Sequence, residues 1–188
     1  PGPKPRTHPF VLSKLREAIK ACRVCTLRQR SRETGKISRR TIYPYGFLYG
    51  HRHYLVAYLP RSSGRKTRLF SLPNIISVEP RDSYFERDPS FDLEDFARNS
   101  FGVFQEDPVD VVWRFTPRAA HDAKDFVFHP NQRLEELKDG SLIVRFNSGG
   151  MLEMCWHIYC WGDQVEVLEP EVLFELCSDA QKKWSGLP

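Results

Sequence analysis

The sequence lacks any hydrophobic run close to the roughly 20 apolar residues that span a bilayer. Its first residues, Pro1 to His8, contain neither an initiator Met nor the apolar segment of a signal peptide. No membrane contact is expected. This start is interpreted as a cut site, and the sequence leaves open whether a preceding domain is removed by truncation or absent by nature.

Acidic residues are almost missing from the first part of the chain. Residues 1–68 hold 17 Lys and Arg against 2 Asp and Glu, a balance of +15. Residues 69–188 hold 11 Lys and Arg against 22 Asp and Glu, a balance of −11. The balances of the two parts sum to the net charge of +4. This asymmetry favours an anionic partner for the first part, with nucleic acid as the leading candidate. The alternative is that the basic part neutralises the acidic part within one fold or one dimer.

A disulfide framework is not expected, because the five cysteines are odd in number. Cys22 and Cys25 form one C-x-x-C, but no second Cys pair or His pair stands at chelating spacing. On a strand, residues three apart also point to opposite faces. The sequence therefore predicts reduced thiols, no metal site, no cofactor and a cytoplasmic location.

Motifs of catalysis are also missing. The sequence has no Gly-rich phosphate loop, no G-x-S-x-G elbow and no H-E-x-x-H. His157, between Trp156 and Ile158, is interpreted as a packed or partly exposed side chain. An enzyme is the least favoured hypothesis, and no catalytic residue is assigned.

What is present indicates a fold of the α+β class. The 40% of hydrophobic residues suffices for a core, and 13% aromatics suits packed β structure. Residues 10–80 are predicted to form a domain in which one helix precedes five short strands, an arrangement typical of a small closed or half-closed barrel. The expected elements are a helix over 10–21 and strands over 22–30, 38–49, 52–59, 67–72 and 75–78.

The remaining residues are predicted to form a linker and a second domain. Residues 81–106 are the linker, with a polar stretch at 81–89 and a short helix from its N-cap Asp92 to about Asn99. Residues 107–188 have the order β-α-β-β-α-β-α, which matches a ferredoxin-like (split βαβ) domain with an extra helix. The expected strands are 109–115, 132–137, 141–146 and 165–167, and the expected helices 117–126, 151–162 and 170–183.

Four segments, in this order, resemble one known family. Pro44–Tyr49 (PYGFLY), His53–Tyr58 (HYLVAY) and Arg68–Ile75 (RLFSLPNI) are similar to motifs of the WYL domain. Residues 109–184 resemble the WCX-type extension that commonly follows WYL domains, with an Asp139-Gly140 hairpin and Val-Leu-Glu-Pro near the last strand. The resemblance covers nearly all of the chain from about Phe10.

This resemblance implies an Sm-like five-stranded β-barrel in a cytoplasmic, bacterial regulator of transcription. Such proteins usually carry an N-terminal helix-turn-helix for duplex DNA, which residues 1–9 are too short to hold. The WYL part is thought to sense a ligand, with single-stranded DNA or RNA as the leading effector class, and a homodimer is expected. Four positions depart from the family pattern: His53 replaces Trp, Ser71 and Asn74 replace two arginines, and Gln29 stands where an aromatic residue is frequent.

The candidate site combines cations for phosphates, flat side chains for base stacking and polar groups for bases or sugars. These residues are Arg68, Arg52, His53, Tyr45, Tyr54, Arg39, Arg40, Ser71 and Asn74.

Each candidate also has a structural interpretation. Tyr45 and Tyr54 are equally suited to packing, and Arg68 to a salt bridge with the acidic part. His53 and Tyr54 are neighbours on a strand, so they face opposite sides. The basic loop of Arg61, Arg65 and Lys66 either contacts the nucleic acid or is a solvated loop tip.

The second domain has two weaker candidates. Arg114 and Arg145 interrupt apolar alternation, so they either complete a ligand cleft between the domains or face solvent. Met151, Met154 and Ile158 are predicted to be core. The favoured hypothesis is a ligand-sensing module of a transcription regulator. The alternative is a dimerisation or structural module that has lost its effector site.

Overall fold

The computed structural model describes residues 5–60 and 67–182, without the side chains of 179–182. The chain divides into two compact units, residues 1–93 and residues 94–188. Both combine helices with an antiparallel sheet, which confirms the α+β class.

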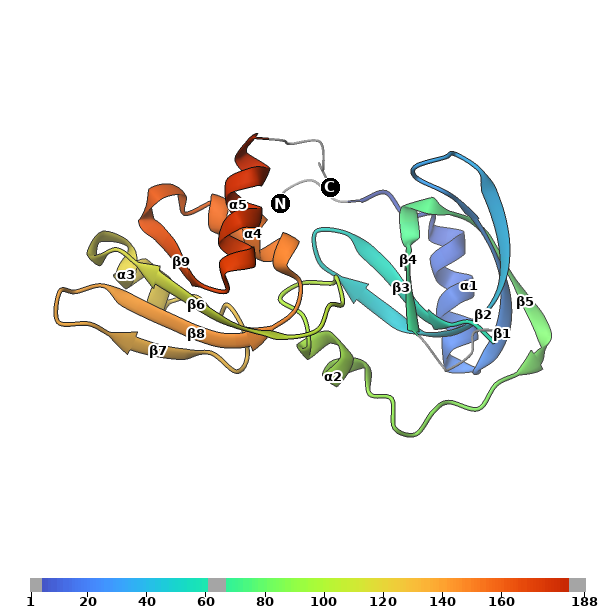
Figure 1. Ribbon diagram of the computed structural model, residues 1–188. Helices are drawn as coiled ribbons and strands as arrows, with labels where there is room; N and C mark the ends of the chain where they lie inside the picture. Colours follow the sequence, from blue (N-terminus) through green and yellow to red (C-terminus); the bar gives the residue numbers. More distant parts are fainter. Residues whose placement is uncertain (1–4, 61–66, 183–188) are drawn as a thin grey trace. The chain divides into compact units, whose positions relative to one another are not determined.

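The first unit consists of one helix and a five-stranded sheet (Figure 1). Its elements are α1 (Pro9–Lys20), β1 (Arg23–Arg30), β2 (Ile37–Tyr49), β3 (His53–Tyr58), β4 (Thr67–Ser71), the 3-10 turn η1 (Leu72–Asn74) and β5 (Ile75–Tyr84). The predicted helix and all five strands are confirmed. Only β5 is much longer than predicted, because its polar residues 79–84 continue to pair with β1.

Five strands pair in the order β4-β3-β2-β1-β5. Long β2 joins the two halves: its first part pairs with β1 and its last part with β3, with a register shift between Pro44 and Gly46. In the part of the chain that the structure describes, no ladder joins β4 to β5. The sheet is therefore open in its hydrogen bonding, so of the closed or half-closed barrel that the sequence predicted, the closed form is not observed.

The core of the first unit is aliphatic. Leu15 of α1, Leu27 of β1, Ile42 of β2 and Leu55 of β3 are all completely buried. Helix α1 packs against β1, β2 and β5 (Figure 1), because Val11, Leu15 and Ala18 recur on one face at helical spacing.

The short helix α2 (Leu93–Arg98) begins at the end of the first unit. It lies where the sequence predicted a helix, but none of its residues is fully buried. The predicted inward set of Leu93, Phe96 and Ala97 is half-buried, since a helix of six residues is too short to bury a complete stripe.

The second unit has the element order β-α-β-β-α-β-α, as predicted. Its elements are β6 (Val109–Phe115), α3 (Pro117–Lys124), β7 (Arg133–Glu136), β8 (Leu142–Ser148), α4 (Met151–Tyr159), the 3-10 turn η2 (Gly162–Gln164), β9 (Val165–Glu169) and α5 (Glu171–Lys182). The strand order is β7-β8-β6-β9, and every pair is antiparallel.

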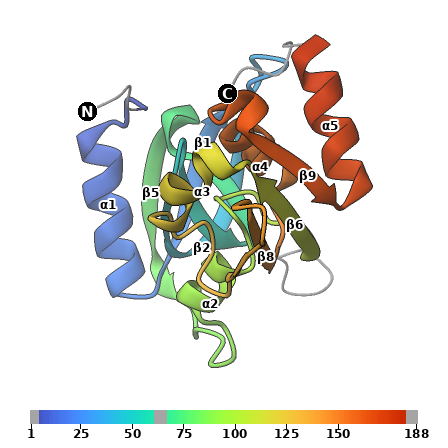
Figure 2. The ribbon, with the colours of Figure 1, turned by 90° about the vertical axis from the view of Figure 1, so that its left-hand side faces the viewer.

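One face of the second sheet carries an aromatic core. Trp113 and Phe115 of β6 are completely buried, and Phe128 and Phe146 pack with them. Residues from α3, α4 and α5 belong to the same cluster, and α5 lies beside α4 and β9 (Figure 2). The predicted core residues Met154 and Ile158 are buried there, and Met151 is partly buried.

Candidate functional site

The strand β4 places two predicted site residues on opposite faces. Arg68 pairs with Ala57 and Ser71 pairs with Tyr54. Residues three apart on a strand point to opposite sides, so exposed Arg68 shares the face of the buried Ala57 and Phe70, whereas half-buried Ser71 shares the face of Tyr54. One ligand on one face therefore contacts Arg68 or the Ser71–Tyr54 pair.

Tyr45 lies inside an aromatic cluster and is only 3% exposed. Its ring stacks on Phe85 at 5.4 Å and meets Tyr58 edge-on at 4.6 Å. The guanidinium of Arg87 lies 4.9 Å from the ring centroid and donates to the carbonyl of Tyr45, while the Tyr45 hydroxyl accepts the backbone N–H of Asp88 at 2.8 Å. These contacts agree with the packing interpretation of this side chain.

The glycine of the PYG segment has a packing reason. A Cβ atom at Gly46 would overlap the side chain of Leu93. Gly46 also directly follows the register shift in β2. The segment therefore combines a bulge, a buried tyrosine and a close approach of the chain at residue 93.

Arg39 and Arg40 are successive residues of β2, so they too face opposite sides. Arg39 forms an ion pair with Glu79 of β5 at 3.1 Å. Arg40 is exposed and is the register partner of Leu27.

Arg52 and His53 lie at the turn between β2 and β3. Arg52 is half-buried. The ring of His53 meets Tyr49 edge-on at 4.8 Å, and Tyr49 is its register partner on β2. The neighbouring Tyr54 is buried. His53 and Tyr54 thus differ in exposure as well as in face.

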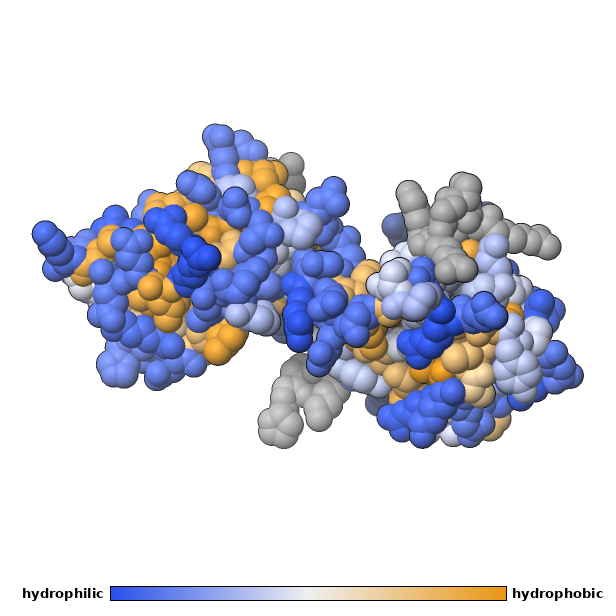
Figure 3. Space-filling view, turned by 90° about the horizontal axis from the view of Figure 1, so that it is seen from below, coloured by the Kyte–Doolittle hydropathy of each residue, from blue (hydrophilic) through white to orange (hydrophobic). Residues whose placement is uncertain are grey.

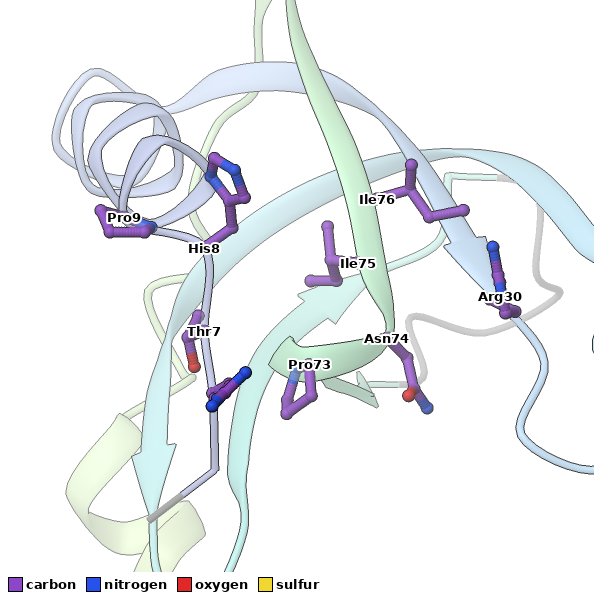
Figure 4. A pocket seen from close by; sticks show the side chains of 9 residues that line it. Thr7, His8, Pro9, Arg30, Pro73, Asn74, Ile75 and Ile76 are labelled. Carbon is purple, nitrogen blue, oxygen red and sulfur yellow. The ribbon is translucent and has the colours of Figure 1, made fainter.

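Asn74 lines a pocket of about 640 Å³ in the first unit. In Figure 4, Thr7 and His8 of the segment before α1 lie on one side of Pro73 and Ile75, and Asn74 and Arg30 lie on the other. The remaining lining residues are Arg6, Pro9 and Ile76.

This pocket has the chemistry of an anion site with an apolar wall. Two arginines, Arg6 and Arg30, line it, and none of its lining residues is acidic. The N-terminus of the 12-residue helix α1 opens beside it at His8 and Pro9, and this end of a helix favours anions. The Thr7 hydroxyl is buried without a hydrogen-bond partner. The volume of the pocket, about 640 Å³, lies within the range of about 300–1,000 Å³ that is usual for small-molecule sites.

Sequence reasoning found Asn74 but missed Arg6, Thr7 and Arg30. The adjacent Arg6 and Thr7, Arg30 and Asn74 lie in three separate parts of the sequence, so only the fold brings them together. A signal that could have found Arg30 is its spacing of two residues from Arg28 at the end of β1, which places both on one face.

In the second unit, the two weaker candidates have carboxylate partners. Arg114 donates to Asp139 at 2.7 Å, and Arg145 lies 3.7 Å from Glu135. Arg145 also lines a pocket of about 460 Å³ whose other charged residues are Arg133, Asp110 and Glu169. Positive and negative charges balance there, unlike in the pocket beside Asn74.

The cysteines are free thiols. Burial raises the pKa of Cys25 to about 11, so this thiol stays protonated at neutral pH. Across residues 5–60 and 67–182, no group of three or more metal-ligating side chains gathers, and none of the helices there is both long and apolar enough to cross a membrane. The basic loop residues Arg61, Arg65 and Lys66 lie outside the described residues.

Fold and site together define a two-unit α+β protein whose basic unit carries an anion-type pocket. Residues 11–80 match the WYL domain family and residues 107–177 match the WCX domain family. The chain therefore contains a WYL domain followed by a WCX domain, as its motifs indicated.

Two solved structures are similar to this chain. One is proteasome accessory factor B/C (PafBC) of Arthrobacter aurescens, with 24% identity over 89% of this chain and 26% of that chain, and a TM-score of 0.39. The other is described as a CRISPR Cas-related protein, with 13% identity over 92% of this chain and 50% of that chain, and a TM-score of 0.57; this likeness shows a shared fold. The chain thus spans about a quarter and a half of their lengths. No curated protein matches it.

Proposed function

We propose that this chain is the ligand-sensing module of a transcription regulator and that it binds single-stranded nucleic acid or a nucleotide-like effector. The observation that carries the proposal is the pocket beside Asn74, with Arg6 and Arg30 and no acidic lining residue. Arginines bind phosphates, and the apolar wall of Pro73, Ile75 and Ile76 suits a base. The match to the WYL and WCX families supports a regulatory role rather than a catalytic one.

Within this proposal, the predicted site residues have different parts. Asn74 offers an amide to a base or sugar from the pocket itself. Arg68, Arg52, His53 and Arg40 are contacts for a strand that passes over the surface. Arg39 lies on the face of β2 opposite to Arg40 and is a phosphate contact on the side of Arg28. The Ser71–Tyr54 pair lies on the face opposite to Arg68, and Tyr45 packs within the aromatic cluster.

The architecture and wider context are part of the same proposal. The strand order β4-β3-β2-β1-β5 supports an Sm-like barrel, and the order β7-β8-β6-β9 supports a ferredoxin-like domain. We assign residues 10–80 and 107–188 to these domains and 81–106 to the linker. The proposal further includes a homodimer and a cytoplasmic location. In it, the chain passes the signal to a duplex-DNA-binding domain outside this chain.

Fluorescence anisotropy with labelled single-stranded oligonucleotides tests this function. We expect binding that weakens as salt rises, because released counterions drive phosphate contacts. Arg30→Gln and Arg68→Ala should each weaken it about tenfold, the scale of one charged hydrogen bond. Arg16→Gln, an exposed arginine of α1, is the matched control and should bind normally. The absence of salt-sensitive binding at low ionic strength, or normal binding by both variants, contradicts the proposal.

A dimerisation module is the second candidate, and exposed apolar side chains of the second unit favour it. Leu168 of β9 and Val172 and Phe174 of α5 are 44%, 50% and 54% exposed. Hydrophobic residues form separate patches among hydrophilic ones on the face that Figure 3 shows. Sedimentation velocity tests this candidate: a stable dimer without oligonucleotide binding supports it, and a monodisperse monomer contradicts it.

A further inference from the structure

Two arginines of the first sheet lie directly opposite each other on neighbouring strands. Arg28 of β1 is the register partner of Arg39 of β2, so both side chains project from the same face. Like charges at directly opposite positions destabilise a strand pair. An anion bound between the two guanidinium groups would remove this repulsion.

Arg30 extends this charged face to the pocket. It follows Arg28 by two residues on β1, so it points to the same side, about 6.6 Å further along the strand. Arg30 is also one of the residues that line the pocket beside Asn74 (Figure 4). We call Arg28, Arg30 and Arg39 the outer arginine face.

Little acidic charge balances the outer arginine face. Glu79 pairs with Arg39 at 3.1 Å, and both side chains are more than half exposed, so water and salt screen this ion pair. Within the described part of the chain, the side chains of Arg28 and Arg30 have no hydrogen bond or ion pair. Two cations one strand repeat apart are therefore open to a partner with regularly spaced negative charges.

We propose that the outer arginine face binds the phosphate backbone of a single strand whose terminal nucleotide occupies the pocket. One phosphate lies at Arg30 and the next lies between Arg28 and Arg39. This inference rests on the proposed function and deepens it: the effector is an oligonucleotide, and a mononucleotide fills only part of the site.

Competition binding with ligands of increasing length tests the inference. The experiment measures how well each ligand displaces a labelled oligonucleotide from the full chain. The ligands are thymidine monophosphate and thymidine oligonucleotides of two, three and five units. Wild-type affinity should rise with length. Arg28→Gln should bind the monophosphate normally but lose about tenfold in affinity for the longer ligands, and its salt slope should fall by about 0.7 for one lost phosphate contact.

Two further variants complete the design. Arg28→Lys keeps the charge and should retain most of the gain with length, and Arg16→Gln should match wild type for every ligand. Normal binding of all lengths by Arg28→Gln, alongside lost binding by Arg30→Gln, overturns the outer arginine face but leaves the pocket standing. If no nucleotide of any length binds, the proposed function itself fails. Equal competition by polyglutamate of matched charge, with the same sensitivity to Arg28→Gln, assigns the face to an acidic protein segment and contradicts the inference.

Discussion

The two units cover an antiparallel sheet in different ways. The first packs one helix against an aliphatic core of residues such as Leu15, Leu27 and Leu55, and places its aromatic cluster around Tyr45. The second packs three helices against an aromatic core around Trp113. Two of their pockets also differ in charge. The pocket beside Asn74 in the first unit has arginines without carboxylates, whereas the pocket beside Arg145 in the second unit has two of each.

This difference in charge between the two pockets indicates which unit is the better candidate for binding an anionic ligand. On the second sheet, Arg133 and Arg145 are also register partners, but Glu135 lies near Arg145, and Asp110 and Glu169 line the same pocket. Internal carboxylates offset that arginine pair, whereas Arg28 and Arg30 of the first unit have no such partners. Uncompensated charge, rather than the number of arginines, distinguishes the two surfaces.

The largest expected effect comes from the aromatic core. Trp113 is completely buried and contacts Phe128 and Phe146, so Trp113→Ala should destabilise the second unit by about 3–5 kcal/mol. All four tryptophans of the chain lie after residue 94, whereas six of the seven tyrosines lie before it. Urea unfolding followed by the fluorescence of the remaining tryptophans therefore measures the second unit separately.

The matched control is Leu55→Ala in the aliphatic core, where Leu55 is completely buried. It should cost about 2–5 kcal/mol in the tyrosine-reported first unit and leave the tryptophan transition in place. A single shared transition that both variants shift equally would show that the two units unfold together, and the comparison between them would lose its energetic basis.

A buried carboxylate of the second unit gives the next largest effect. Glu153 of α4 is 4% exposed and accepts the backbone N–H groups of Val103 and Phe104 at 2.6 and 2.9 Å. Glu153→Ala leaves both donors without a partner and should destabilise the second unit by about 2–3 kcal/mol. Glu153→Gln keeps an acceptor oxygen and should cost clearly less. Equal losses in the two variants, measured by tryptophan-detected unfolding, would contradict this assignment.

The sequence predicted the elements far better than the site. Alternation of apolar residues located β6, since Val111, Trp113 and Phe115 need one buried face. It underestimated β5, because the polar residues Arg81 and Asp82 gain their strand conformation from pairing with β1 and from contacts with Thr26 and Arg23. Such pairing depends on residues more than 50 positions away.

The candidate site shows the same limit. Periodicity assigned His53 and Tyr54 to opposite faces within one strand, as the structure places them. The same alternation was not applied to β4, so Arg68 and Ser71 were grouped in one site although they face opposite sides of that strand. The pocket itself needs the segment before α1, the end of β1 and the start of β5, which no local pattern joins.

A smaller effect should follow from removing the carboxylate beside the outer arginine face. Glu79 holds Arg39 and repels phosphates, so Glu79→Gln should tighten oligonucleotide binding about two- to fivefold at low salt, the scale of one exposed ion pair. The gain should vanish at high salt because screening removes it. Glu17→Gln on α1 is the control for a lost negative charge. Weaker binding by Glu79→Gln would mean that Glu79 positions Arg39 for the ligand.

The smallest effect concerns acid stability of the second unit. The pKa of Asp139 is lowered, first by the hydroxyl and backbone N–H of Ser141, which donate at 2.6 and 2.9 Å, and then by Arg114. A lowered pKa stabilises the folded state fully above the unfolded value of about 3.9, and this contribution disappears as pH falls through the folded pKa. Asp139→Asn should therefore unfold more easily than wild type at pH 6, and the difference should shrink below about pH 4. Asn keeps the shape of the side chain and the oxygen that Ser141 contacts, so a difference that stays constant from pH 6 to pH 3 would show that it does not come from ionisation of Asp139.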